Sequence, residues 1–309
     1  MSNIPKRIFY VWGAGEPKRR DVNLCILSWR QVCPDYEIIE INENSIDYFN
    51  FQEELKNNKW FKTVYENKMY AFVADYIRVK VLYDNGGIYL DTDVSLLNNF
   101  DEYLREPAFV GIQKDSKSGS DNLEPAILGS RKGNSLIKEI SDFYGKDVWK
   151  LPISTMPQIF NYYITKNYGK IIYPEYDKQE IIRLKDITLY PEKYLIPMRC
   201  GEEFKMEFLK PETTTIHWFG GSWTNGNIKT FLLNKHKIKT EKLVKECFSK
   251  KTYFDNPFIK AERVFKKLSV EIDFYYLFRF KYRYWGRDKF LVLFLFGVPI
   301  KIIKIGVSK

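Results

Sequence analysis

The chain has 309 residues, of which 45% are apolar and 17% aromatic, so it can bury one large core and is neither a disordered protein nor a small disulfide scaffold. Its four cysteines show no C-x-x-C spacing and its first residues lack the apolar core of a signal peptide, which together indicate the reducing cytoplasm. The net charge of +10 would suit a nucleic-acid partner. No nucleic-acid-binding module is recognisable in the sequence, however, and we do not expect such a partner.

The N-terminal part of the chain predicts a strand, a helix and a second strand. Residues 7–11 and 36–41 are apolar runs typical of strands, and residues 21–33 between them have helical periodicity. This order indicates the α/β class, in which helices cover both faces of a sheet. Trp12 ends the first strand, where its plain interpretation is a core tryptophan.

Residues 68–85 form a strongly predicted helix. Apolar side chains recur on one face at about 100° per residue, and Asn85-Gly86 supplies the C-terminal stop signal. Asp75 and Arg78 lie about 60° apart on a second face, away from the apolar stripe. They form either an ordinary i,i+3 ion pair or a fork that grips hydroxyl groups.

The next predicted strand leads directly into Asp91-Thr92-Asp93. Because side chains alternate along a strand, Asp91 and Asp93 are expected to project together, while Ile88 and Leu90 are buried. Two carboxylates at one place leave coordination positions open, which suits Mg²⁺ or Mn²⁺ bridging the phosphates of a nucleotide. The alternative is a pair of solvated aspartates in a turn at the strand's end.

His217 is one of two histidines in the chain and precedes the glycine-rich stretch Gly220-Gly-Ser-Trp223. A neutral imidazole is a suitable ligand for Mn²⁺, so His217 is a candidate third metal ligand. The alternative is a histidine that simply packs beside its neighbouring tryptophan.

The C-terminal residues 270–309 are basic and aromatic, with eight Lys or Arg against three Asp or Glu. The apolar run 290–300 is far shorter than the roughly 20 residues that a membrane-spanning helix needs. Basic and aromatic residues favour the surface of an anionic leaflet, so we expect peripheral attachment to a membrane. The alternative is a hairpin or helix that packs on the rest of the chain or on a second subunit, which leaves homo-oligomerisation open.

Four blocks of the sequence carry a resemblance to a known family. They are Ile4–Trp12, Ala74–Arg78, Leu82–Asp93 and His217–Trp223. The chain resembles the glycosyltransferases whose sugar-binding region contains a DXD motif (family 32), which include Och1-like mannosyltransferases and bacterial capsule and lipopolysaccharide enzymes. A more distant likeness extends to the glucosyltransferase domains of the large clostridial toxins. The resemblance implies a GT-A fold with a Rossmann-like mixed sheet flanked by helices, a nucleotide-sugar donor, a divalent metal and retention of anomeric configuration.

The same resemblance implies roles for residues on the donor side. Trp12 would stack on the nucleotide base, a contact that contributes about 1–3 kcal/mol. Asp75 and Arg78 would hold hydroxyl groups of the donor sugar through charged hydrogen bonds. Ser222 and Trp223 would donate a hydroxyl and an indole N–H to the diphosphate and stabilise the charge that develops on the departing nucleotide.

On the metal side, the resemblance makes Asp93 the principal carboxylate ligand of Mn²⁺ or Mg²⁺. Asp91 would bind the metal and also reach the ribose or the sugar, and His217 would complete the shell. A bound dication would favour the ionised form of both carboxylates.

The predicted activity is retaining, metal-dependent transfer of a hexose or N-acetylhexosamine from a nucleotide sugar, UDP-linked by the resemblance, to a saccharide acceptor. A lipid-linked acceptor would place the enzyme peripherally on the inner face of a bacterial cytoplasmic membrane, in surface polysaccharide synthesis. Residues 1–235 would form the GT-A catalytic domain, and residues 236–309 a helical or basic-aromatic extension for membrane association or oligomerisation. Similar enzymes place groups near the acceptor where this chain has Asp121, Asn122 and Glu124, in a stretch that equally reads as a solvated loop.

Two other classes of function fit part of the pattern. A nucleotide-sugar pyrophosphatase or phosphotransferase would share a two-carboxylate metal site but would leave Asp75 and Arg78 without a role. A catalytically silent carbohydrate-binding protein on the same fold would not need an intact set of metal and sugar positions.

Overall fold

The computed structural model describes residues 3–114, 121–171, 180–220, 231–232, 235–236, 242, 278–285, 288–295 and 298–307. The chain divides into two compact units, Met1–Val244 and Lys245–Lys309. The predicted boundary between residues 235 and 236 lies slightly N-terminal to this division.

The first unit is built on a seven-stranded mixed sheet with the strand order β2-β1-β3-β6-β5-β8-β7. Its strands are β1 (Arg7–Val11), β2 (Glu37–Ile41), β3 (Gly87–Leu90), β5 (Ala108–Lys114), β6 (Asp121–Ser130), β7 (Ile182–Arg183) and β8 (Thr188–Tyr190). Strand β1 runs parallel to β2 and β3, whereas β6 is antiparallel to both of its neighbours, β3 and β5. This sheet confirms the α/β class and the mixed sheet that the resemblance implied.

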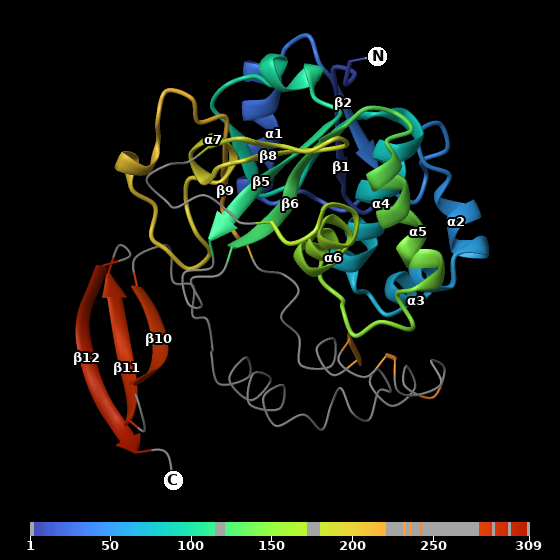
Figure 1. The fold of residues 1–309 in the computed structure, drawn as a ribbon. Coiled ribbons are helices and arrows are strands. Elements are labelled where there is room, and N and C mark those ends of the chain that lie inside the picture. Colours follow the sequence, from blue (N-terminus) through green and yellow to red (C-terminus); the bar gives the residue numbers. More distant parts are fainter. Residues whose placement is uncertain are drawn as a thin grey trace. The chain divides into compact units, whose positions relative to one another are not determined.

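Helices cover both faces of the sheet (Figure 1). They are α1 (Arg20–Val32), α2 (Phe51–Asn57), α3 (Lys59–Glu66), α4 (Tyr70–Asn85), α5 (Ser135–Lys146), α6 (Met156–Tyr168) and α7 (Glu192–Leu195), with the short 3-10 helices η1 (Asp101–Arg105) and η2 (Met206–Phe208). Helices α4 and α6 lie on one face, and α1 and α7 lie on the other. The predicted strand–helix–strand start of the chain is present as β1, α1 and β2.

Strand alternation divides the core between these two helical layers. Ile8 and Ile88 belong to the hydrophobic cluster that includes Trp29 of α1. Tyr89, the residue after Ile88, lies on the opposite face of the sheet, where its ring contacts Arg78 of α4. Ile88 and Leu90 are both fully buried, as the sequence predicted.

Helix α4 is buried on more than one face, which the sequence did not predict. Some of its buried residues belong to the predicted apolar stripe. Arg78, which does not, is also buried and is only 4% exposed. The predicted second face is therefore not a solvent face, because α4 is enclosed by the sheet and by neighbouring helices.

Two glycines make the connection from α4 to β3. Gly86 (φ 68°) and Gly87 (φ 130°) adopt backbone conformations that L side chains rarely take. A Cβ atom on Gly86 would lie 2.7 Å from the backbone nitrogen of Lys132, and one on Gly87 would lie 2.9 Å from the ring of Phe9. This tight turn fixes where β3 starts and thus where Asp91 follows it.

A small two-stranded sheet brings distant parts of the chain together. Strand β4 (Val94–Leu96) pairs antiparallel with β9 (Thr215–His217), and Val94 lies opposite His217. The buried Trp29 donates its indole N–H to the carbonyl of Val94 at 2.7 Å. The start of β4 is therefore fixed from two sides.

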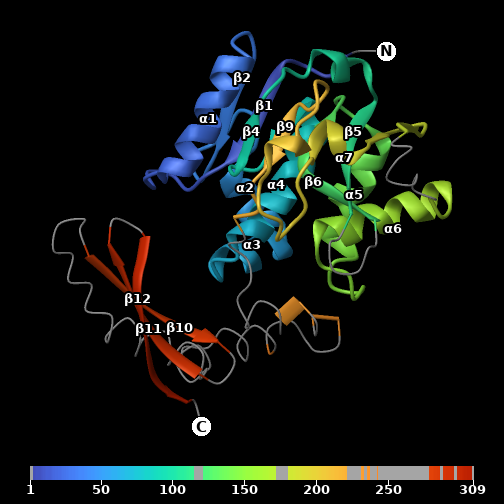
Figure 2. The same cartoon turned by 90° about the vertical axis from the view of Figure 1, so that its left-hand side faces the viewer.

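The second unit contains the antiparallel strands β10 (Phe278–Trp285), β11 (Asp288–Leu295) and β12 (Val298–Val307) in that order (Figure 2). The sequence left a helix or a hairpin open for this region, and these residues form strands. Aromatic and β-branched side chains, in which the segment is rich, favour strands over helices. Within the described residues, no helix has both the length and the hydrophobicity that crossing a membrane requires.

Candidate metal centre

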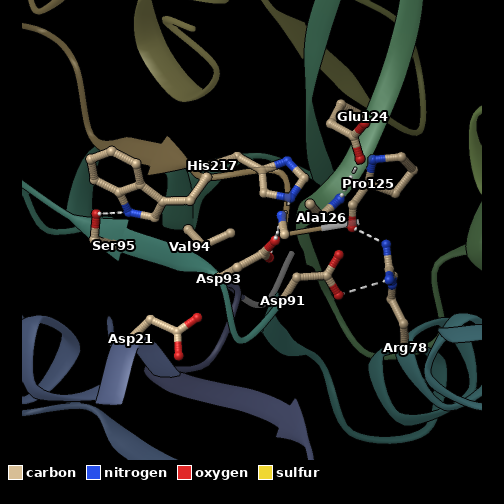
Figure 3. Close-up of polar contacts among 12 residues, drawn as sticks. Asp21, Arg78, Asp91, Asp93, Val94, Ser95, Glu124, Pro125, Ala126 and His217 are labelled. Carbon is tan, nitrogen blue, oxygen red and sulfur yellow. Dashed lines mark hydrogen bonds and ion pairs between the residues drawn. The ribbon is translucent and has the colours of Figure 1, made fainter. Parts of the chain in front are cut away.

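Asp91 and Asp93 lie in the turn between β3 and β4. The amide of Asp91 donates to the carbonyl of Ala126 on β6 at 2.9 Å, and the amide of Val94 donates back to the carbonyl of Asp91 at 3.0 Å. The two carboxylates do point into one site (Figure 3). The turn brings them there, however, and not the strand alternation on which the prediction relied.

His217 completes a cluster with these two carboxylates. One ligand atom from each of Asp91, Asp93 and His217 can be chosen so that all lie within 4.8 Å of one another. The Nε2 atom of His217 lies 3.3 Å from Oδ1 of Asp93. Two adjacent ligand atoms on an octahedral ion with bonds of about 2.1 Å are about 3 Å apart, so this spacing suits shared coordination. Two carboxylates and one imidazole could hold a divalent cation here.

The second oxygen of Asp93 is held by the backbone that follows His217. Oδ2 of Asp93 accepts a hydrogen bond from the amide of Gly220 at 2.7 Å. Phe219 has a φ of 51°, an uncommon conformation for a residue with a side chain, and this bend brings the Gly220 amide to the carboxylate. A Cβ atom on Gly220 would lie only 3.2 Å from the same oxygen.

The electrostatics of this pair favour an ionised carboxylate. Burial alone would raise the pKa of Asp93, but the imidazole of His217 and the amide of Gly220 outweigh burial and lower it. For His217, burial lowers the pKa, whereas Asp93, Glu124 and Asp91 raise it, and the net pKa is raised. A cation would find a charged ligand here.

Arg78 links the predicted acid–base pair to the metal cluster. Its guanidinium lies 3.2 Å from the carboxylate of Asp75, donates to Asp91 at 2.9 Å and donates to the carbonyl of Pro125 at 2.6 Å. Its plane lies over the ring of Tyr89 at 4.6 Å. The structure thus contains the predicted i,i+3 ion pair, and it directs Arg78 toward Asp91.

Burial governs the two carboxylates beside Arg78. It raises the pKa of Asp75 to about 7, even though Arg78 opposes the change. It also raises the pKa of Asp91, again against the effect of Arg78. A dication bound between Asp91 and Asp93 would favour their charged forms.

The remaining predicted donor-side residues are placed only in part. Trp12 follows β1, which runs parallel to β3, so Trp12 and Asp91 leave the sheet at the same edge. The partly buried Trp12 donates its indole N–H to the carbonyl of Glu16 at 2.8 Å. Ser222 and Trp223 lie outside the described residues.

Some contributors to the site were not found by sequence reasoning, or were given another role by it. Glu124, predicted to lie near the acceptor or in a solvated loop, lies on β6 near His217, Asp91 and Arg78. Arg19, paired with Asp21 at 2.9 Å, is close enough to Asp93 for that carboxylate to contribute, after Asp21, to raising its pKa. No periodicity marks these residues, because they reach the site through the sheet order and the start of α1.

Comparisons with known proteins show what this chain is similar to. Residues 19–110 match the family described as "Glycosyltransferase sugar-binding region containing DXD motif". The chain is 32% identical over 141 residues to inositol phosphoceramide mannosyltransferase 3 of Schizosaccharomyces pombe, covering 44% of this chain and 36% of that protein. It is 27% identical over 192 residues to an uncharacterised glycosyltransferase of Acanthamoeba polyphaga mimivirus, covering 60% and 72% of the two chains. The solved PaToxG glycosyltransferase superposes with a TM-score of 0.42 at 20% identity, covering 54% of this chain and 71% of that one. The chain therefore spans little more than a third of the length of the fission yeast relative.

Proposed function

We propose that this chain is a metal-dependent glycosyltransferase, because residues 19–110 match the family described as a glycosyltransferase sugar-binding region containing a DXD motif. It transfers a hexose or an N-acetylhexosamine from a nucleotide sugar, UDP-linked, to a saccharide acceptor. The observation that supports this proposal most directly is the cluster of Asp91, Asp93 and His217, whose ligand atoms lie within 4.8 Å of one another at the sheet edge where β3 ends.

In this proposal Asp91, Asp93 and His217 hold Mn²⁺ or Mg²⁺. The metal, when bound, neutralises negative charge on the donor diphosphate. The chain itself supplies the positioning: Arg78 fixes one oxygen of Asp91, and the Gly220 amide fixes one oxygen of Asp93. These contacts hold the ligands before the donor arrives, which lowers the reorganisation needed during the reaction.

The other donor-side roles follow the same arrangement. Trp12 stacks on the nucleotide base at the edge that it shares with Asp91. Asp75 binds a hydroxyl of the donor sugar together with Arg78, and Ser222 and Trp223 donate to the diphosphate. In the transfer, the bond from the anomeric carbon to the diphosphate oxygen breaks and a bond to the acceptor hydroxyl oxygen forms on the same face. The acceptor proton leaves on the departing phosphate, so the configuration is retained.

We also propose that the acceptor is lipid-linked and that the enzyme works at the inner face of a bacterial cytoplasmic membrane, in surface polysaccharide synthesis. The fission yeast relative carries a lipid, inositol phosphoceramide, in its name. The net charge of +5 in residues 270–309 suits an anionic leaflet, where each basic group contributes about 1 kcal/mol.

The experiment that tests this function is nucleotide release from a panel of UDP- and GDP-sugars, measured with Mn²⁺, with Mg²⁺ and with EDTA. Selective release of UDP from one sugar donor, abolished by EDTA, is the expected result. Release of a nucleoside monophosphate with a sugar phosphate would instead identify a pyrophosphatase. Absence of both release and nucleotide binding would favour the silent carbohydrate-binding protein.

A further inference from the structure

Glu124 stands where strand β6 departs from regular pairing. Val110 of β5 pairs with Leu128, but the next residue, Gly111, pairs with Glu124, so three residues of β6 bulge out between them. Bulges of this kind redirect side chains and occur next to functional sites. Here the bulged residues supply the carbonyl of Pro125 to Arg78 and the carbonyl of Ala126 to the amide of Asp91.

Two hydrogen bonds hold the carboxylate of Glu124. Its Oε1 accepts from the amide of Ala126 at 3.2 Å. With the amide of Gln113 oriented to satisfy its neighbours, Oε2 accepts from Gln113 at 3.1 Å, while the Gln113 oxygen accepts from the amide of Cys200 at 3.3 Å. An ionised carboxylate has about four acceptor sites, so these two bonds leave capacity for another donor.

The imidazole of His217 has a ring nitrogen that needs a hydrogen-bond acceptor. Its Nε2 faces Asp93 at 3.3 Å, whereas its Nδ1 is buried and has no hydrogen-bond partner among the described residues. A histidine that binds a metal through one nitrogen almost always donates a hydrogen bond from the other. Figure 3 shows the ring of His217 with Asp93 on one side and Glu124 on another.

The two groups already interact through space. Burial has the largest effect on the pKa of each group, and Glu124 acts to raise the pKa of His217 while His217 acts to lower that of Glu124. Glu124 is not a member of the three-residue ligand cluster found in the described part of the chain. It is a neighbour of His217 and not a member of the ligand cluster.

We propose that Glu124 is a positioning residue for His217: its carboxylate accepts the Nδ1–H of the imidazole, which leaves Nε2, on the side of Asp93, available to a metal. Gln113 and the Ala126 amide hold the carboxylate in turn. The proposal rests on the proposed function only in assigning a metal as the group that Nε2 faces. The orientation of His217, and the competition between Glu124 and Asp93 for its proton, are properties of the protein without metal.

The first test is the tautomer of His217, read from ¹⁵N chemical shifts of histidine-labelled, metal-free protein at a pH where the imidazole is neutral. The chain has only two histidines, so His217→Asn assigns the spectrum and His236 is an internal reference. Asp93 competes by accepting an Nε2–H, so wild-type protein should show a larger share of the Nδ1–H tautomer than Glu124→Ala. Glu124→Gln should keep that share, because the amide oxygen still accepts. Glu124→Met, which keeps the side-chain length without a strong acceptor, serves if the alanine variant does not fold.

The second test is titration with Mn²⁺ alone, without a nucleotide. Glu124→Ala should weaken Mn²⁺ binding by about 10–100-fold, and Glu124→Gln by clearly less. Glu106 is the matched control: it binds the hydroxyls of Thr188 and Tyr190 at the opposite end of β5, so Glu106→Gln should leave Mn²⁺ affinity unchanged.

The outcomes separate this proposal from the proposed function. An unchanged tautomer and unchanged Mn²⁺ affinity in Glu124→Ala would overturn it. If the wild-type protein binds no Mn²⁺, the metal part of the proposed function fails, while the tautomer measurement still decides the role of Glu124.

Discussion

At the scale of single residues, Arg78 determines whether two partly buried carboxylates are compensated. It contacts both Asp75 and Asp91 and is itself only 4% exposed. Removing one partner of a buried ion pair costs about 3–5 kcal/mol, because a buried charge is left uncompensated. We therefore expect Arg78→Ala to lower the free energy of unfolding in urea by this amount, with a smaller loss when Asp75→Asn is already present. A loss below about 1 kcal/mol would show that Arg78 does not stabilise these carboxylates.

Asp75 gives the stability of the metal-free protein a defined pH dependence. Its pKa is about 7 in the folded state against 3.8 as the ordinary value, with burial as the main cause. Between these values the folded state binds more protons than the unfolded state, so stability falls as pH rises from about 4 to 7.

Asp75→Asn cannot ionise and should remove this part of the slope, up to about 4 kcal/mol in total. The measurement is urea unfolding in EDTA at pH 5 and pH 8 for both proteins. An identical pH dependence in wild type and variant would contradict the assignment.

Much of the residue-level site is predictable from sequence, and the limit is physical. Asp91, Asp93 and His217 were selected as metal ligands from residue chemistry and a family resemblance, and the structure brings all three together. The choice of partner by Arg78 was not predictable, because it depends on a carbonyl of β6 that is adjacent only in the folded sheet. The position of Glu124 beside His217 was not predictable either, because these residues are adjacent only in the folded sheet.

At the scale of elements, the connection from α4 to β3 sets the position of the metal ligands. Gly87 has a φ of 130°, and a Cβ atom there would meet the ring of Phe9 at 2.9 Å. Gly87→Ala should cost about 1–3 kcal/mol of stability and also weaken Mn²⁺ binding, because β3 would shift. Thermal unfolding and Mn²⁺ titration are the measurements.

Gly145→Ala is the matched control for this prediction. Gly145 lies within α5, and a Cβ atom there would have nothing within 4 Å. Alanine should stabilise the helix by up to about 1 kcal/mol and leave Mn²⁺ affinity unchanged. Equal effects of the two substitutions would mean that the α4–β3 turn has no special role.

Elements with strong local signals were predictable, and those defined by distant pairing were not. The first strand, α1, β2 and α4 agree with the predicted ranges to within two residues, because periodicity and stop signals are local. The turn at Asp91–Asp93 was expected as a continuing strand. Its geometry depends on pairing between β4 and β9, whose partners lie more than 100 residues apart in the chain. Sheet order and the β6 bulge are likewise non-local.

At the scale of the whole molecule, the C-terminal residues are the proposed means of membrane attachment. Deleting residues 270–309 removes a local net charge of +5. The shortened chain should lose most flotation with anionic vesicles, and binding of the intact chain should weaken as salt rises, because screening acts over about 10 Å at 0.1 M salt. Undiminished flotation of the shortened chain would remove the attachment idea, and self-association of the intact chain would favour a subunit interface.

We propose that Asp91, Asp93 and His217 form one divalent metal site for the diphosphate of a nucleotide sugar. The measurement that tests it most directly is calorimetric titration of UDP and GDP into the wild-type protein and into Asp93→Asn, each with Mn²⁺ and with EDTA. We predict nucleotide binding to the wild type only with Mn²⁺, and binding to the variant weaker by more than about 100-fold, since even partners outside the ligand shell contribute 10–100-fold. Equally tight binding in EDTA, or to the variant, would contradict the claim.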